Sequence, residues 1–131
     1  MLSILPIIPI HELLHGLAFK FMGAGKLVFG ANFKEFVFYV TVDRFVLNKK
    51  QFYFLALTPF IVLTLVFLGF LFVNDLYTRW VGLVLLAFHT SCCIGDFALM
   101  AYFARFDKNE KVFSYDDVTT KTSYFFKKVS A

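Results

Sequence analysis

Long apolar runs dominate the chain, and their lengths predict helices that cross a membrane. Residues 52–73 contain no charged side chain, and residues 80–103 contain only His89 and Asp96 as strongly polar members. Each run exceeds the roughly 18 to 20 residues that a helix needs to span a bilayer. The opening run, at about residues 3–22, is shorter and holds two prolines, but it is long enough to span with little tilt. The pattern therefore predicts three transmembrane helices.

A cleaved signal peptide is the competing interpretation of the first run. No basic residue precedes it and no small-x-small cleavage pattern follows it, so we expect a retained helix. Pro6 and Pro9 are tolerated in a first helical turn, and Gly23 marks the expected end. The sequence opens inside this apolar segment, which leaves open that it is a fragment of a longer protein.

The spacing of apolar side chains changes to strand-like alternation between the first two runs, and to near-helical spacing in the C-terminal tail. Side chains alternate along residues 36–43 after a turn-forming Gly-Ala-Asn, so we expect a short β-hairpin or sheet over about residues 26–47. In the tail, residues 104–131, the segment SYDD resembles a capping box and apolar side chains follow at near-helical spacing. This predicts an amphipathic helix at the membrane surface, or alternatively a solvated helix packed on its own domain.

Composition and charge extend the membrane prediction to an orientation. Apolar residues make up 60% of the chain, and Phe alone accounts for 20 positions, whereas soluble domains are roughly 45–50% apolar. Of 13 basic residues, six lie from Lys20, at the end of the first run, to Lys50, just before the second; six follow the third run, and Arg79 lies in the turn between the second and third. Since basic loops favour the cytoplasm, we expect the first loop and the tail there. Basic flanks facing lipid headgroups explain the net charge of +4, so no nucleic acid partner is expected.

These patterns combine into one predicted fold class. We expect a mainly α-helical, multi-pass integral membrane protein of 131 residues that forms a single domain. The sequence does not predict its oligomeric state. The predicted elements are transmembrane helices at about 3–22, 52–73 and 80–103, a β-element at 26–47, and a cytoplasmic tail at 104–131.

The first run contains HELLH at residues 11–15, a pattern typical of zinc peptidases. Positions i and i+4 of a helix share one face, so His11 and His15 can reach the same metal ion. Glu12 then lies near a zinc-bound water and can take its proton as the water attacks a carbonyl group. The alternative is a pair of core histidines that hydrogen-bond to the backbone.

A catalytic zinc site needs a third protein ligand, and the third run offers Asp96. An unpaired carboxylate inside an apolar helix is costly, whereas coordination to a cation stabilises it. The alternative is a carboxylate that is paired with a basic group or protonated. His89 is seven residues earlier on the same face, roughly 10 Å away along the axis, too far to share the ion. It could polarise the substrate or stabilise an oxyanion, or simply be a hydrogen-bonded helix histidine.

Together, PIHELLHG, the β-like segment, LALTPF and HTSCCIGDF resemble the putative zincin peptidase family of small bacterial membrane proteins. The order of parts is also similar to the core of site-2 proteases, which cleave membrane-embedded substrates. The resemblance implies His11, His15 and Asp96 as zinc ligands and Glu12 as the catalytic base. Here Gly95 precedes the aspartate where site-2 proteases have a following glycine, and His89 stands where they have an asparagine.

The sequence therefore predicts a membrane metallopeptidase that uses zinc and cleaves a peptide or membrane-protein substrate, with the lipid bilayer as its surroundings. Glu12 and His89 are the candidate catalytic residues, and His11, His15 and Asp96 are the candidate metal ligands. A non-enzymatic membrane protein with a structural or metal-handling zinc site is the main alternative. An assembly partner that acts through a Phe-rich surface is the third.

Overall fold

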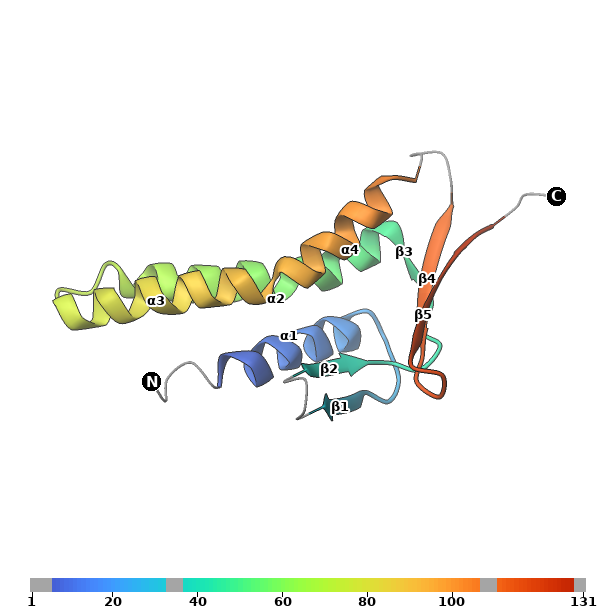
Figure 1. The fold of residues 1–131 in the computed structure, drawn as a ribbon, viewed down its shortest axis with the longest axis horizontal. Helices are drawn as coiled ribbons and strands as arrows, with labels where there is room; N and C mark the ends of the chain where they lie inside the picture. Colours follow the sequence, from blue (N-terminus) through green and yellow to red (C-terminus); the bar gives the residue numbers. More distant parts are fainter. Residues whose placement is uncertain (1–5, 33–36, 107–110, 129–131) are drawn as a thin grey trace.

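The computed structural model describes residues 6–32, 37–106 and 111–128, which form four helices and five strands (Figure 1). The predicted ranges also include residues 3–5, 33–36, 107–110 and 129–131, which lie outside the described residues. In chain order the elements are α1 (Ile7–Phe21), β1 (Val28–Asn32), β2 (Val37–Thr41), β3 (Leu47–Asn48), α2 (Lys49–Phe70), α3 (Leu76–Cys92), α4 (Ile94–Ala104), β4 (Val112–Asp117) and β5 (Thr122–Lys127).

Local sequence signals explain where α1 begins and ends. The carbonyl of Pro6 accepts the first helical hydrogen bond, from Ile10 N at 3.1 Å, and a proline is well tolerated at a helix start. At the other end Gly23 has a positive φ of 81°, a conformation that glycine adopts without steric cost. Ala24 N bonds back to Phe19 O at 3.0 Å, so the helix closes in a Schellman motif. Local sequence therefore defines both ends of the helix that carries the HELLH motif.

The helices α2 and α3 form a long antiparallel hairpin, with α4 continuing beyond a bend (Figure 1). A reciprocal capping box between Asn48 and Gln51 starts α2, and the side chain of Asp75 caps α3. The axis bends by 41° between α3 and α4. Just before the bend, the hydroxyls of Thr90 and Ser91 donate to carbonyls four residues earlier, an interaction that bends helices.

Two small antiparallel sheets complete the fold. β1 and β2 pair with Phe29 opposite Val40, and β2 packs against α1. The second sheet has the order β3-β4-β5, so the C-terminal hairpin pairs with the residues just before α2. Its strands are joined by stacked aromatic pairs, with Tyr115 opposite Tyr124. The hairpin stands at one end of the long helical pair (Figure 1).

Two apolar clusters hold α1 against the rest of the molecule. One lies at the C-terminal end of α1 and consists of Ala18, Phe19, Ala24, Val42, Leu47 and Leu55. The other lies at its N-terminal end and consists of Ile7, Leu63, Phe67 and Leu85. His11 and His15 lie between the two clusters along the helix. The packing therefore holds α1 in place on both sides of the HELLH motif.

The predicted fold with three transmembrane helices is wrong. Within the described residues, α2 alone is long and apolar enough to cross a membrane, and α3 with α4 passes only if the bent pair counts as one span. α1 has 15 residues and begins at Ile7, short of the length needed for a span. The predicted multi-pass topology and cytoplasmic orientation are therefore not supported. What remains is one helix, α2, that could span a membrane.

The predicted C-terminal amphipathic helix is also wrong, because the tail forms the strands β4 and β5. The segment SYDD forms the end of β4, and a turn follows it, in which Asp117 Oδ1 accepts from the backbone N–H groups of Thr119 and Thr120. The turn ends at Lys121, whose φ is 52°. Alternating aromatic residues favour a strand, and pairing across the hairpin outweighed the helical spacing.

Gly82 should be essential to the close packing of α3 on α2. A Cβ atom placed there would lie 2.8 Å from Phe70 Cβ and 3.2 Å from Phe67 O. We expect Gly82→Ala to lower the free energy of unfolding by about 1–3 kcal/mol relative to Gly69→Ala, measured by denaturant unfolding. Gly69 is a matched control because a Cβ there meets no atom within 4 Å. Equal stability of the two variants would contradict this account.

Candidate metal centre

The HELLH motif lies on the inner side of α1, where both histidines are buried. His11 is 4% exposed and His15 is 9% exposed, although most ionisable side chains avoid such positions. Their Nε2 atoms lie 3.2 Å apart. Two imidazole nitrogens at this distance need a shared proton or a shared cation between them, because two lone pairs facing each other repel.

Asp96, in the first turn of α4, brings its carboxylate to the same point. Its Oδ2 lies 3.1 Å from His11 Nε2 and its Oδ1 lies 3.4 Å from His15 Nε2. The ligand atoms of a tetrahedral zinc ion lie about 3.3 Å apart, because each bond is about 2.0–2.1 Å long. The three separations lie close to this value, although His11 and His15 face different oxygens of Asp96, so the donor set fits a zinc ion in chemistry and approximate spacing.

A backbone carbonyl in α2 fixes the orientation of His15. His15 Nδ1 donates to the carbonyl oxygen of Leu55 at 3.0 Å, which leaves Nε2 of the neutral ring as the atom with the lone pair. That carbonyl is free because the residue four positions later is Pro59, which has no N–H to donate to it. The proline thus supplies the acceptor that metal-binding histidines typically require.

The electrostatics of the cluster attract positive charge. Burial alone would lower the pKa of His15, but the hydrogen bond and charge of Asp96, together with the charge of Glu12, raise that pKa above its usual value. Burial raises the pKa of Glu12, and the adjacent His15 and His11 partly oppose this effect. A cation between the histidines and Asp96 would take the place of the proton that His15 otherwise attracts.

Glu12 lies beside the histidines and contacts the edge of β2. One of its carboxylate oxygens, Oε2, accepts the backbone N–H of Val40 at 3.1 Å. A ligand atom of Glu12 lies within 4.8 Å of ligand nitrogens of His11 and His15. The strand therefore holds this carboxylate next to the cluster, and the outer edge of β2 faces it.

A cavity of about 740 Å³ opens onto the cluster. Its walls come from α1, β2, the start of α2, α4 and the C-terminal hairpin, which contributes Ser114 and Phe125. His11, Glu12, His15 and Asp96 all line it. The cavity is large enough for a segment of peptide chain to reach these four residues.

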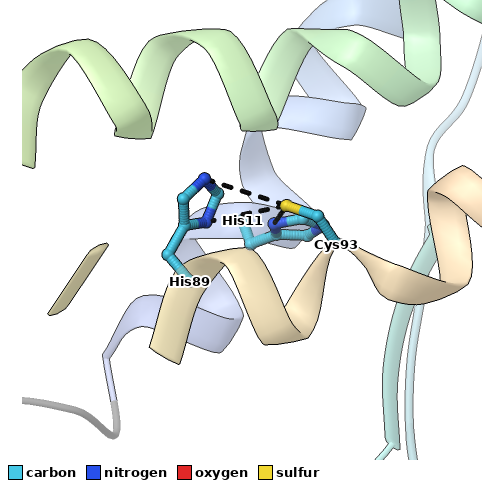
Figure 2. A group of neighbouring side chains, drawn as sticks. All are labelled: His11, His89 and Cys93. Atoms are coloured by element: carbon cyan, nitrogen blue, oxygen red, sulfur yellow. Dashed lines mark hydrogen bonds between the residues drawn. The ribbon is translucent and has the colours of Figure 1, made fainter. Parts of the chain in front are cut away.

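His89 lies outside this wall. It is fully buried (0% exposed), and among the described residues that line the cavity neither His89 nor Cys93 is found. The side chains of His89 and Cys93 pack against the ring of His11 (Figure 2). The structure thus brings four of the five predicted site residues to the cavity and leaves His89 behind them.

Sequence reasoning missed the contributions of Leu55, Val40 and Cys93 to this arrangement. Leu55 and Val40 act through backbone atoms, so their side chains carry no signal. Pro59 was the available signal for Leu55, since a proline inside a helix frees the carbonyl four residues earlier. For Cys93 the signal was its spacing of four residues from His89, which places both on one face of a helix.

Comparison with known proteins points to one family. A family profile described as putative zincin peptidase matches residues 4–110. No curated protein and no solved structure matches the chain. The matched region contains HELLH and Asp96 and ends before β4, so the C-terminal hairpin lies outside it.

Pro59→Ala should weaken metal binding although residue 59 touches no metal. The alanine N–H would compete with His15 for the Leu55 carbonyl, and loss of such a supporting bond typically costs 10–100-fold in metal affinity. We expect a zinc affinity lowered at least about tenfold, measured by competition with a chelator, and a mixed His15 tautomer in nitrogen NMR spectra. Thr58→Ala is the control, because that hydroxyl bonds to the carbonyl of Phe54 on the exposed side of α2. Equal affinities in both variants would disprove this role.

Proposed function

The chain belongs to the putative zincin peptidase family, and on this basis we propose that it is a zinc-dependent peptidase whose ligands are His11, His15 and Asp96. The observation that carries the proposal is the convergence of these three side chains within 3.4 Å of one another at the wall of a large cavity. The family implies zinc, and two imidazoles with one carboxylate are a typical ligand set for a catalytic zinc site with an open position.

Glu12 is the proposed general base. His11, His15 and Asp96 would hold a zinc ion that would supply Lewis-acid activation of a water molecule near neutral pH. Glu12 would accept the proton of that water at a carboxylate oxygen, which its position beside both histidines allows. The bond from Val40 N–H holds the carboxylate in place between turnovers.

The proposed substrate is an extended peptide that lies along β2. Within the described residues β2 pairs with β1 on one edge only, and its other edge faces Glu12 and the cavity. An extended chain can add to such an edge through backbone hydrogen bonds. This would present its carbonyl groups to the metal and to Glu12. We do not assign a contact with substrate to His89, because its ring is fully buried.

We further propose that the enzyme works at a membrane, in the manner of site-2 proteases. α2 could cross a bilayer, and large apolar side chains are exposed on α2 and α3, among them Leu65, Leu76 and Trp80 at 61–69%. Exposed apolar surface of this extent favours contact with lipid or another apolar partner. α2 also carries the Leu55 carbonyl that holds His15, so the same helix links the metal centre to this surface.

Asp96→Asn should remove most of the bound zinc. The amide has no negative charge to offset the cation, while His11 and His15 remain. We expect about one zinc ion per chain in the wild type and a small fraction of this in Asp96→Asn and in His11→Ala, measured by elemental analysis of purified protein. Asp75→Asn, in the exposed cap of α3, should keep the wild-type content. Unchanged zinc in the Asp96 variant would exclude a site with three protein ligands.

Glu12→Gln should abolish cleavage while the zinc content stays near one ion per chain. A general base contributes about 10²–10⁴-fold to rate, so the rate of cleavage of a membrane peptide should fall at least about 100-fold. Asp75→Asn is again the control. Full activity in Glu12→Gln would exclude the proposed base. Absence of cleavage by a zinc-loaded wild type across a peptide library would favour the alternative, a structural or metal-handling zinc site.

A further inference from the structure

A second group of metal-ligating side chains lies at the other nitrogen of His11. Its members are His11, His89 and Cys93, drawn together in Figure 2. All three are buried, with exposed fractions of 4%, 0% and 0%. Their ligand atoms lie within 4.8 Å of one another. Because His11 directs Nε2 toward His15 and Asp96, its Nδ1 is the atom that faces this group.

The separations within this group suit a small cation bound to sulfur. Cys93 Sγ lies 4.0 Å from His11 Nδ1 and 3.8 Å from both ring nitrogens of His89. A cation with bonds of about 2.3 Å to sulfur and 2.0–2.1 Å to nitrogen places these atoms about 3.6–3.8 Å apart, in tetrahedral or trigonal geometry. The two sulfur–nitrogen separations exceed these values by at most a few tenths of an ångström, so cation binding would require side-chain movements of that size at the sulfur. Cys93 follows His89 by four residues, so both project from the same side of the helical chain.

The surroundings of His89 orient its ring for this role. His89 Nε2 donates to the carbonyl oxygen of Phe60 at 3.4 Å, so the lone pair of the neutral ring is on Nδ1. The rings of Phe60 and Phe67 pack against it, with centroids 6.0 and 5.8 Å away. Such a bond from the second ring nitrogen to a carbonyl is the usual support of a metal-binding histidine.

The position of the cluster excludes a direct catalytic use. Neither His89 nor Cys93 is among the described residues that line the cavity, so a substrate in the cavity meets His11 first. A buried thiol between two imidazoles can then serve in two ways. It can relay a hydrogen bond from His11 to His89, or it can bind a cation together with both rings.

We propose that His11 Nδ1, His89 Nδ1 and Cys93 Sγ form a second cation site, separate from the zinc site at His11 Nε2. Two imidazoles and a thiolate favour a soft or borderline ion such as Cu(I) or Zn(II) over Mg²⁺ or Ca²⁺. Binding releases the thiol proton to solvent, because the thiolate is the ligand. With both sites filled, His11 would be the residue common to the two sites, and its Nδ1 proton would also pass to solvent. This site goes beyond the proposed peptidase function, since it adds an ion that the hydrolysis does not require.

Cadmium titration of the purified full chain tests the second site, because only thiolate coordination gives an ultraviolet sulfur-to-cadmium charge-transfer band. We expect this band to saturate at one thiolate-bound ion per chain. Cys93→Ser should abolish it, and His89→Ala should weaken it at least about tenfold in cadmium affinity. Cys92→Ser is the matched control and should keep the full band, because the neighbouring thiol of Cys92 lines the cavity instead.

Asp96→Asn separates this proposal from the peptidase proposal, since it should lose the first ion and keep the charge-transfer band. X-ray absorption of the cadmium-loaded wild type gives a result that does not depend on any variant, and it should show a sulfur neighbour. A band that survives in Cys93→Ser, or that disappears in Cys92→Ser, would overturn the assignment. Absence of both the band and a sulfur neighbour would also overturn it and leave Cys93 as a hydrogen-bond relay.

Discussion

The fold of this molecule has to satisfy one constraint, which is the burial of two imidazoles and a carboxylate in contact with one another. His11, His15 and Asp96 meet within 3.4 Å, at a point where α1 and α4 come together. Burying such groups is costly unless they are paired or bind a cation. Apolar clusters at both ends of α1 provide the favourable packing that offsets this cost. The site therefore depends on the fold, while a bound cation would in turn stabilise the contact between α1 and α4.

α2 orients the rings of His15 and His89, on the two sides of His11, and contributes no side chain to either proposed cation site. Its carbonyl at Leu55 accepts from His15, and its carbonyl at Phe60 accepts from His89. These two acceptors flank Pro59, which interrupts the helical hydrogen bonding and is itself fully buried. Pro59 thus frees the Leu55 carbonyl that orients the ring of His15, within a helix that could span a membrane. This explains why a proline inside an otherwise regular helix is useful here.

The errors of sequence interpretation had physical causes that lie outside local pattern. The tail carried a capping signal at Asp117 and near-helical apolar spacing, yet stacked pairs such as Tyr115 with Tyr124 made it a hairpin. The last apolar run read as one straight helix, but the hydroxyls of Thr90 and Ser91 bond to preceding carbonyls where it bends by 41°. Aromatic pairing decided the conformation of the tail, and polar side chains accompany the bend, although hydropathy registers neither interaction.

The sequence by itself determined the HELLH spacing, the expected hairpin after α1 and the proline in α2, because these follow from local geometry. It also determined the choice of Asp96 as the candidate third ligand, because a charge in an apolar run is costly unless it is paired. Only the tertiary structure decided that Asp96 meets the two histidines, that Val40 holds Glu12 and that His89 lies behind the cavity with Cys93. The contacts of Asp96 and of Val40 join residues 85 and 28 positions apart in the sequence. The position of His89 and Cys93 depends on which side of the bent α3–α4 pair faces α1. Such contacts depend on packing between elements, which periodicity along the chain does not encode.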